Sequence, residues 1–507
     1  MTLAARRDDA RGATEPTGMG ARTAAALVFG TSAAVLVVEL VALRLLAPYL
    51  GLTLETNTLV IGVALTAIAL GSWLGGRAAD ATDPRRLLGP AIGVSGAVVA
   101  LTPATVRSAA EVAPSGFVLV ALGAILVPGA LLSAVTPIVT KLRLTTLEET
   151  GTVVGRLSGI GTAGAIVGTV LTGFVLISRV PVGVIMVGLG VLLLVTALLV
   201  DLRVRGWSGW SRGARVGAGA AVVAGGLGVV VAPGGCDVET TYHCARVVED
   251  PADPDGRTLV LDGLRHSYVD LADPTRLDFE YVRALAAVAD ASFPAGEPIA
   301  AQHLGAGGAT LPRYLAADRP GTRSVVSEID GGVVQVDLDR LGLETGPDLE
   351  VRVEDARLGL GEVDDESRDL VVGDAFGGVS VPWHLATVEM MGEVDRVLDD
   401  DGVYAANVID HAPLSFARAE VATLAAVFDH VALLGPGDVL DASGGGNMVV
   451  VASDAPLPLE DLAGGLEERE TQWGVLTGDP LRSWVADADV LTDDFAPVDQ
   501  LLTPYGA

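Results

Sequence analysis

Seven long apolar stretches in the first half of the chain restrict its fold more than any other feature. Each is long enough to cross the hydrocarbon of a bilayer, which takes about 20 residues. Soluble cores do not repeat such a pattern with so few charges between. We therefore predict a multi-pass α-helical membrane domain of about seven helices over residues 23–234, in which the last stretch is the least hydrophobic. The stretches lie at roughly 23–48, 57–76, 87–106, 116–137, 155–177, 181–200 and 214–232.

Basic residues mark alternate loops of this domain. Residues 1–22 are polar with four arginines, which predicts a disordered cytoplasmic tail. The loops at 77–86, 141–156 and 203–215 are also rich in Lys and Arg, whereas the loops between them hold little beyond Arg107 and Arg179. Cytoplasmic loops carry the excess of cations, so we expect the N-terminus to be cytoplasmic. Seven spans would place everything after Gly235 outside the cell, and we expect the protein in the cell membrane.

The charge changes abruptly after this domain. Up to Gly235 there are 17 Lys and Arg against 11 Asp and Glu, and from Cys236 onward 16 against 52. So acidic a second half argues against nucleic-acid binding, which needs clustered cations. Cys236 and Cys244 are the chain's two cysteines, and outside the cell they would form a disulfide. Two reduced thiols in a cytoplasmic domain are the alternative. No metal site is expected, because two thiols and His243 lack a fourth ligand.

A glycine-rich turn organises the second half. The stretch 299–330 predicts a strand, a turn with Gly305 and Gly307, a helix, and a second strand that carries Glu328. Glycine allows close approach of a ligand to the backbone, and an acid 23 residues past Gly305 is placed to accept bonds from ribose hydroxyls. This pattern indicates the first unit of a doubly wound nucleotide-binding sheet. The alternative is a sheet turn that merely needs small residues.

The surrounding segments extend this unit into a domain. Residues 235–298 alternate apolar and polar residues around an Asp-Pro-Asp-Gly turn, which predicts a β-hairpin region. Residues 299–507 alternate strands and helices, which predicts an α/β Rossmann-like domain. Asp355 and Asp374 each follow a predicted strand. Acids there face the crevice in which open α/β sheets bind ligands.

The order of these motifs resembles the spermidine synthase, or polyamine aminopropyltransferase, family. The likeness rests on an ETxY…LVLDG hairpin, the glycine turn, Glu328, an acid-Ala turn at Asp355, and a DAF segment at Asp374 before a proline. Over 35–502 the chain looks like bacterial membrane proteins that fuse a major facilitator-like part to a spermidine synthase-like part. The stretch GSWLGGRAADATDPRR is similar to a major facilitator loop. Seven spans are short of that family's usual twelve, so transport does not follow.

The resemblance implies a class I methyltransferase-type fold and assigns roles to single residues. Gly305, Gly307, Glu328 and Asp355 would seat an adenosyl donor, with Pro382 in the loop over the base. Asp374 matches the first acid of the family's catalytic Asp-x-x-Asp loop. The implied co-substrate is decarboxylated S-adenosylmethionine or S-adenosylmethionine, and no permanently bound cofactor is expected.

The positions that would hold the amine depart from the family. Its turn carries an Asp where this chain has Gly308, and the second acid of its catalytic loop is here Gly377. A glutamine after LDG is replaced by His266. The Tyr-x-Glu motif becomes Tyr281-Val282-Arg283, so the loss of two carboxylates and the gain of an arginine predict a degenerate acceptor site. His266, Tyr268 and Tyr281 are the remaining candidates for substrate binding.

These observations leave three functions open. The first is a membrane-anchored aminopropyltransferase-like enzyme, and the second is a methyltransferase that uses S-adenosylmethionine. The third is a ligand-binding domain without chemistry on a transporter-like membrane protein. The expected partners are the lipid bilayer and a small nucleoside ligand, not nucleic acid, and a homodimer is left open.

Overall fold

The computed structural model describes residues 19–50, 54–112, 114–144, 149–177, 179–205, 212–231, 236–305 and 307–503. The chain forms two compact units. The helical unit comprises Met1–Leu45 and Thr58–Gly234, and the α/β unit comprises Leu46–Asn57 and Gly235–Ala507. Most of the tail predicted over 1–22 lies outside the described residues, although Ala21 and Arg22 already belong to the first helix.

Six helical segments in the described residues are long and apolar enough to cross a membrane. α4 and α5 together form one of them, and α6 continues into a π-helical turn, Thr172–Leu176, to form another. The eight helices are α1 (Ala21–Leu50), α2 (Leu54–Ala81), α3 (Pro84–Val112), α4 (Phe117–Ser133), α5 (Val135–Arg143), α6 (Thr150–Leu171), α7 (Val182–Arg205) and α8 (Arg212–Val231).

α8 corresponds to the seventh predicted stretch. Several of its side chains lie outside the described set, so its count as a span stays a prediction. It is a helix of 20 residues that packs closely on α3. A Cβ at Gly225 of α8 would lie 2.4 Å from the carbonyl oxygen of Ala100, so only glycine fits there.

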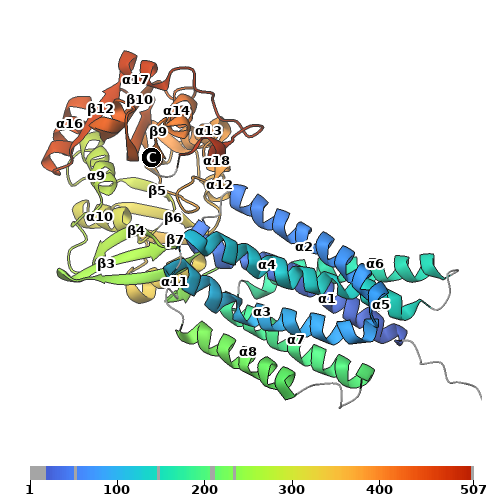
Figure 1. The fold of residues 1–507 in the computed structure, drawn as a ribbon. Coiled ribbons are helices and arrows are strands. Elements are labelled where there is room, and N and C mark those ends of the chain that lie inside the picture. Colours follow the sequence, from blue (N-terminus) through green and yellow to red (C-terminus); the bar gives the residue numbers. More distant parts are fainter. Residues whose placement is uncertain are drawn as a thin grey trace, which may run out of the picture. The chain divides into compact units, whose positions relative to one another are not determined.

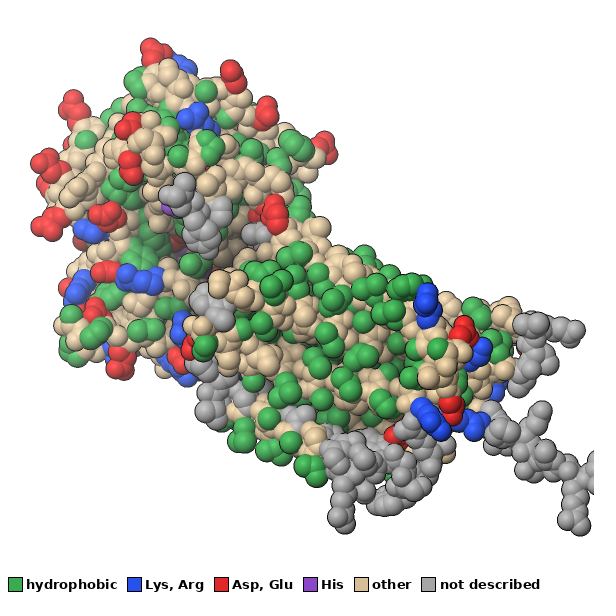
Figure 2. Space-filling view, viewed as in Figure 1, with side chains coloured by type: hydrophobic (Ala, Val, Ile, Leu, Met, Phe, Trp, Pro, Cys, Tyr) green, Lys and Arg blue, Asp and Glu red, His purple; other side chains and the backbone are tan. Residues whose placement is uncertain are grey.

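Small residues set the spacing of the other helices in the same way. A Cβ at Gly71 of α2 would lie 2.1 Å from the Ala130 carbonyl oxygen of α4, and one at Gly164 of α6 2.2 Å from that of Phe29 in α1. Such close backbone contact is typical of helices that pack in a membrane, where lipid offers no hydrophobic drive for helix association. Hydrophobic side chains cover much of the visible face of this unit, and Lys and Arg gather at one of its ends (Figure 2). Lys141 pairs there with Asp80 at 2.7 Å, which puts two cation-rich loops at the same end.

The α/β unit begins with a four-stranded antiparallel sheet in the order β1-β2-β3-β4. Its last three strands form a meander, and Ala245 of β2 and Leu259 of β3 share a buried core with Val333 and Val336 of α11. The elements are β1 (Val238–Glu239), β2 (Cys244–Asp250), β3 (Asp253–Leu261), β4 (Leu264–Asp270) and α11 (Gly331–Arg340).

An eight-stranded mixed sheet follows, in the order β12-β10-β11-β9-β8-β5-β6-β7. Figure 1 labels six of its strands, β12, β10, β9, β5, β6 and β7. Pairing is parallel from β7 to β9 and antiparallel from β9 to β12. The order reverses between β5 and β8, which is the switch point at which such sheets bind ligands. The strands are β5 (Ala300–Leu304), β6 (Arg323–Glu328), β7 (Leu349–Val353), β8 (Arg368–Gly373), β9 (Leu398–His411), β10 (His430–Pro436), β11 (Gly445–Ser453) and β12 (Trp473–Thr477).

Helices cover both faces of this sheet. On β8, Val371 belongs to one core, while its neighbours Leu370 and Val372 belong to the other, because successive strand residues point to opposite faces. The two cores explain the near-continuous apolar runs of the central strands. The first core is covered by α12 (Ala356–Leu360), α13 (Val388–Val397), α14 (Ser415–Leu424) and α17 (Gly478–Val485), and the second by α9 (Glu280–Ser292), α10 (Thr310–Asp318) and α16 (Leu459–Glu468).

Candidate functional site

A cavity of about 660 Å³ lies in the α/β unit at the carboxyl ends of β5, β6 and β8. This is the switch point of the sheet, where the strand order leaves a crevice. Eight of the nine residues predicted for catalysis or ligand binding line it, and Tyr268 is the exception. The eight are Gly305, Gly307, Glu328, Asp355, Asp374, Pro382, His266 and Tyr281.

Packing within the protein itself requires glycine in the turn after β5. Gly305 has φ +98°, and a Cβ there would lie 2.4 Å from the carbonyl oxygen of Asp374. Gly307 has φ +49°, and its Cβ would lie 2.5 Å from Ser267 Oγ. Both glycines also line the cavity. Chain packing therefore explains the small residues without a ligand, as the alternative interpretation of this turn proposed.

Glu328, Asp355 and Pro382 line what we call the donor side of the cavity, after the adenosyl donor that the sequence resemblance predicts there. Glu328 ends β6 and is 9% exposed, and its Oε1 accepts a hydrogen bond from the backbone N–H of Asp330 at 2.8 Å. Asp355 caps α12 by accepting from the backbone N–H groups of Arg357 and Leu358 at 3.0 and 3.1 Å. Its other oxygen lies 3.0 Å from His384 Nε2. Backbone groups thus fix both carboxylates.

Asp374, at the end of β8, belongs to the acceptor side. Asn407 of β9 donates from Nδ2 to its Oδ1 at 2.9 Å, and the hydroxyl of Tyr281 in α9 lies 3.3 Å from its Oδ2. Asn447 of β11 in turn donates to Asn407 Oδ1 at 3.0 Å. Burial raises the pKa of Asp374 to about 6, against the opposing effect of the bonds from Asn407 and Tyr281. At neutral pH the carboxyl group of Asp374 is therefore mostly ionised, and its pKa is close enough to 7 for it to accept a proton as a general base.

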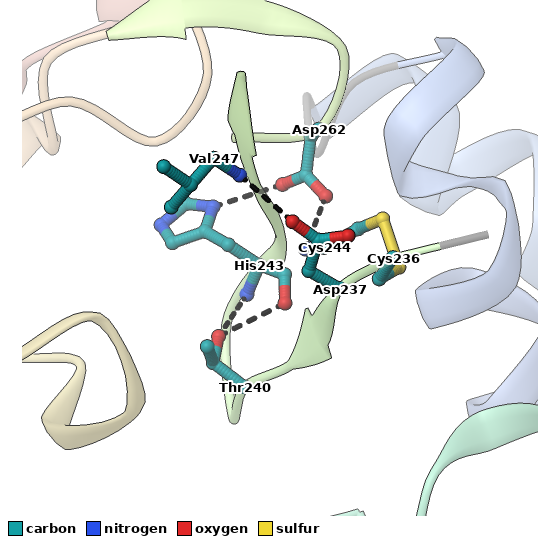
Figure 3. The surroundings of a disulfide bond; sticks show 7 residues. All are labelled: Cys236, Asp237, Thr240, His243, Cys244, Val247 and Asp262. Atoms are coloured by element: carbon teal, nitrogen blue, oxygen red, sulfur yellow. Dashed lines mark hydrogen bonds and ion pairs between the residues drawn. A yellow bond between two sulfur atoms is a disulfide. The ribbon is translucent and has the colours of Figure 1, made fainter. Parts of the chain in front are cut away.

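Two histidines line the cavity: His243, directly before β2 (Figure 3), and His266 of β4. A disulfide joins Cys236 to Cys244, and Asp262 accepts from the backbone N–H of Cys244 at 2.9 Å. Asp262 also contacts His243 Nδ1 at 2.8 Å, which orients this cavity-lining ring. Burial, together with His243, lowers the pKa of His266 to about 4. His266 is therefore neutral at pH 7, and its ring offers one hydrogen-bond donor and one acceptor. The side-chain amide of glutamine, which the sequence resemblance expects at this position, offers the same two groups.

Two expectations about the acceptor side are wrong. Tyr268 is buried away from the cavity, and its hydroxyl donates to Asp250 at 3.2 Å. His266 has no partner in the β3–β4 register, because a bulge shifts the pairing there, so simple alternation does not put both side chains on one face. Arg283 is also absent from the lining, and its Nη1 donates to the carbonyl oxygen of Arg469 at 3.0 Å. Two helical residues beyond Tyr281, it lies about 200° around α9.

The charged lining of the cavity is therefore mainly acidic. Among the described lining residues there are five carboxylates and one guanidinium, Arg265. Sequence reasoning missed Asn407, although a polar residue inside the apolar strand GVYAANVI was a usable signal. No local sequence pattern indicated Trp473 or Asn447, because these residues reach the cavity only through the pairing of their strands. No group of three or more His, Cys, Asp or Glu within the described ranges could hold a metal.

The fold and the cavity together define an α/β protein with an acidic cavity at the switch point of its sheet. No family model matches the chain. The chain is 28% identical over 212 residues to the polyamine aminopropyltransferase of Vibrio vulnificus, a match that covers 39% of this chain and 68% of that protein.

Two solved structures give similar matches. A probable spermidine synthase from Corynebacterium glutamicum is 27% identical with a TM-score of 0.47, covering 51% of this chain and 96% of that one. Spermidine synthase from Thermotoga maritima is 19% identical with a TM-score of 0.35, covering 43% and 72%. The chain is thus similar to spermidine synthase-like aminopropyltransferases.

Proposed function

We propose that the α/β unit transfers an aminopropyl group from a decarboxylated S-adenosylmethionine-type donor to an amine. The observation that carries this proposal is Asp374, a buried base that shares one acidic cavity with Glu328 and Asp355. The similarity to a polyamine aminopropyltransferase points to the same chemistry.

The residues have distinct tasks in this transfer. Glu328 would accept hydrogen bonds from the ribose and Asp355 would lie near the adenine. The nitrogen lone pair of the amine attacks the methylene group next to the sulfonium, the carbon–sulfur bond breaks, and methylthioadenosine leaves with the electron pair. Asp374 takes the proton that the nitrogen loses, as general-base catalysis requires. Asn407 and Tyr281 hold the carboxylate in place.

The methyltransferase alternative has less support. S-Adenosylmethionine carries a carboxylate that its decarboxylated form lacks. Five carboxylates against one guanidinium disfavour a further negative charge in this cavity. The single guanidinium is already engaged, because Arg265 pairs with Asp278 at 3.0 Å and lies over the ring of Phe279.

The test is turnover by the purified full-length protein in detergent or nanodiscs. Incubation with decarboxylated S-adenosylmethionine and a panel of amines should release methylthioadenosine and an aminopropylated amine, both detected by mass spectrometry. Asp374→Asn should abolish release. Methylthioadenosine affinity, measured by calorimetry with Glu328→Ala as control, reports the donor side separately. No release with any amine, despite intact methylthioadenosine binding, would overturn the proposal.

We further propose that the helical unit anchors the enzyme in the membrane with its N-terminus in the cytoplasm. With α8 as a seventh span, the α/β unit lies outside, and the disulfide between Cys236 and Cys244 supports this side, because disulfides persist in oxidising compartments. Thiol labelling of intact cells should then detect these cysteines only after reduction. Labelling without a reductant, and only after permeabilisation, would place the unit in the cytoplasm. The major facilitator-like loop remains a prediction without further support.

A further inference from the structure

A short loop closed by the disulfide packs against the donor side of the cavity. Cys236 and Cys244 are eight residues apart and enclose Thr240, which is 7% exposed (Figure 3). The loop lies tightly against the first turn of α11, because a Cβ at Gly332 would lie 2.5 Å from Thr240 Cβ. Only two residue pairs join β1 to β2, so the covalent bond between the sulfurs reinforces a very short ladder in closing this loop.

The side chain of Asp330 receives the contacts that this loop makes. Its carboxylate is fully buried, and Oδ2 accepts hydrogen bonds from the Thr240 hydroxyl and from the backbone N–H of Tyr242, the latter at 3.2 Å. Its Oδ1 accepts from the backbone N–H of Gly332 at 3.0 Å, which caps α11. The loop thus supplies two hydrogen bonds to one oxygen of a buried carboxylate. Leaving such an oxygen without its partners is costly, so Asp330 should shift when the loop does.

Asp330 is also bonded directly to the donor side. Its backbone N–H donates to Glu328 Oε1 at 2.8 Å, so a shift of Asp330 moves the carboxylate that the proposed function assigns to the ribose. Thr240 is not among the described residues that line the cavity. Its effect on a ligand therefore passes through Asp330 and Glu328.

We propose that Thr240 is a positioning residue for the nucleoside and that the disulfide keeps it in place. This inference rests on the proposed function, in which Glu328 binds the ribose. The oxidised loop holds Asp330, and hence Glu328, in the geometry that fits the ribose. A dithiol reductant gives two electrons and two protons to the sulfurs of Cys236 and Cys244, which become two thiols while the reductant closes into a disulfide. Nucleoside affinity then falls, because the loop is no longer closed covalently.

The first experiment measures the methylthioadenosine affinity of the full-length protein by calorimetry. Thr240→Val keeps the shape of the side chain and removes the hydroxyl, so the affinity should fall roughly five- to tenfold. Thr240→Ser keeps the hydroxyl and should bind nearly as well as the wild type. Thr241→Val is the matched control, because Thr241 is the exposed neighbour of Thr240 in the same loop, and its affinity should not change.

The second experiment tests the disulfide. Cys236 and Cys244 are the chain's two cysteines, so a reductant has a single target. Dithiothreitol should weaken methylthioadenosine binding by the wild type roughly two- to fivefold, and reoxidation should restore it. The double variant Cys236→Ser/Cys244→Ser should bind as weakly as the reduced wild type and should not respond to the reductant. Thermal unfolding is recorded for each sample, and affinities are compared well below the melting temperature.

The outcomes separate this inference from the proposed function. Affinity that falls in Thr240→Val and on reduction, without turnover by the wild type, keeps the inference and overturns the transfer reaction. Turnover by the wild type, with unchanged methylthioadenosine affinity in Thr240→Val, overturns the inference and keeps the reaction. A lower melting temperature without a loss of affinity makes Thr240 purely structural and also overturns it. Affinity that falls in Thr240→Val but not on reduction overturns the role of the disulfide, and failure of the wild type to bind methylthioadenosine overturns the whole inference.

Discussion

The donor and acceptor sides of the cavity hold their carboxylates by different means. Glu328 and Asp355 accept hydrogen bonds from backbone N–H groups at the ends of β6 and the start of α12. Asp374 is held by side chains from other strands and helices, and burial raises its pKa to about 6. Backbone contacts persist when side chains change. Under the proposed function, nucleoside binding should therefore tolerate most sequence changes, whereas the acceptor chemistry should change with single residues.

The largest effect that separates the two sides is expected from Asp374→Asn. The amide keeps the shape of the side chain but cannot take a proton, so turnover should fall by roughly 10²–10⁴-fold. Methylthioadenosine should bind about as well as to the wild type, because the donor side is untouched. Single-turnover kinetics and calorimetry measure the two quantities. If nucleoside binding is lost together with turnover, the two sides are not independent.

Glu328→Gln should give the converse result. The amide oxygen can keep the contact with the backbone of Asp330, but the charge that strengthens bonds to ribose hydroxyls is lost. A hydrogen bond to a charged group contributes roughly 1.5–3 kcal/mol, so methylthioadenosine should bind about 10- to 100-fold more weakly. Calorimetry checks this value, and thermal unfolding checks that the fold is retained. Unchanged affinity would remove Glu328 from the donor side.

The pH dependence tests the acceptor side alone. The folded-state pKa of Asp374 is raised, and the ionised form is the base, so kcat/KM should fall about tenfold per pH unit below about pH 6. Asn407→Leu removes a donor that favours the ionised carboxylate, so the midpoint should move to higher pH. Both proteins are measured with the same acceptor amine, so the titration of the amine contributes equally to the two pH profiles. An unshifted midpoint would show that another group controls the profile.

The smallest effect is expected from returning acids to the acceptor side. A Cβ at Gly377 has only the Ser380 carbonyl oxygen near it, at 3.9 Å, whereas one at Gly308 would meet Ser267 Cβ and Val269 Cγ2 at 3.0 Å. Gly377→Asp should therefore fold normally and tighten amine binding only a few-fold. Gly308→Asp should lower the melting temperature, since overpacking costs roughly 1–3 kcal/mol. Equal stability of the two variants would contradict this difference.

Local patterns in the sequence predicted the parts of the site that depend on one element. A strand followed by an acid places that acid at the carboxyl end of the sheet, and Glu328, Asp355 and Asp374 all line the cavity. Within the described residues, six of the seven apolar stretches form helices that are long and apolar enough to cross a membrane. Both features depend on the residue pattern within a single strand or helix, and that pattern follows directly from the backbone geometry of the element.

Errors arose where a side chain's direction depends on a neighbouring element. The β3–β4 bulge separates His266 from Tyr268, and the helical phase of α9 turns Arg283 away from Tyr281. The predicted degenerate acceptor site rested on the acids missing at Gly308 and Gly377 and on Arg283. Arg283 does not line the cavity, whereas Asp278 and Glu280 do.

The sequence by itself determined the apolar helices, the order of strands and helices in the α/β unit, and the acids at strand ends, because all three follow from short-range periodicity. Tertiary structure alone decided which side chains meet Asp374. Asn407 and Tyr281 contact it and Asn447 contacts Asn407, although these residues come from two strands and a helix up to 166 residues apart in the numbering. The raised pKa of Asp374 also belongs to the fold, since burial creates it and no local pattern in the chain encodes how deeply a carboxylate is buried.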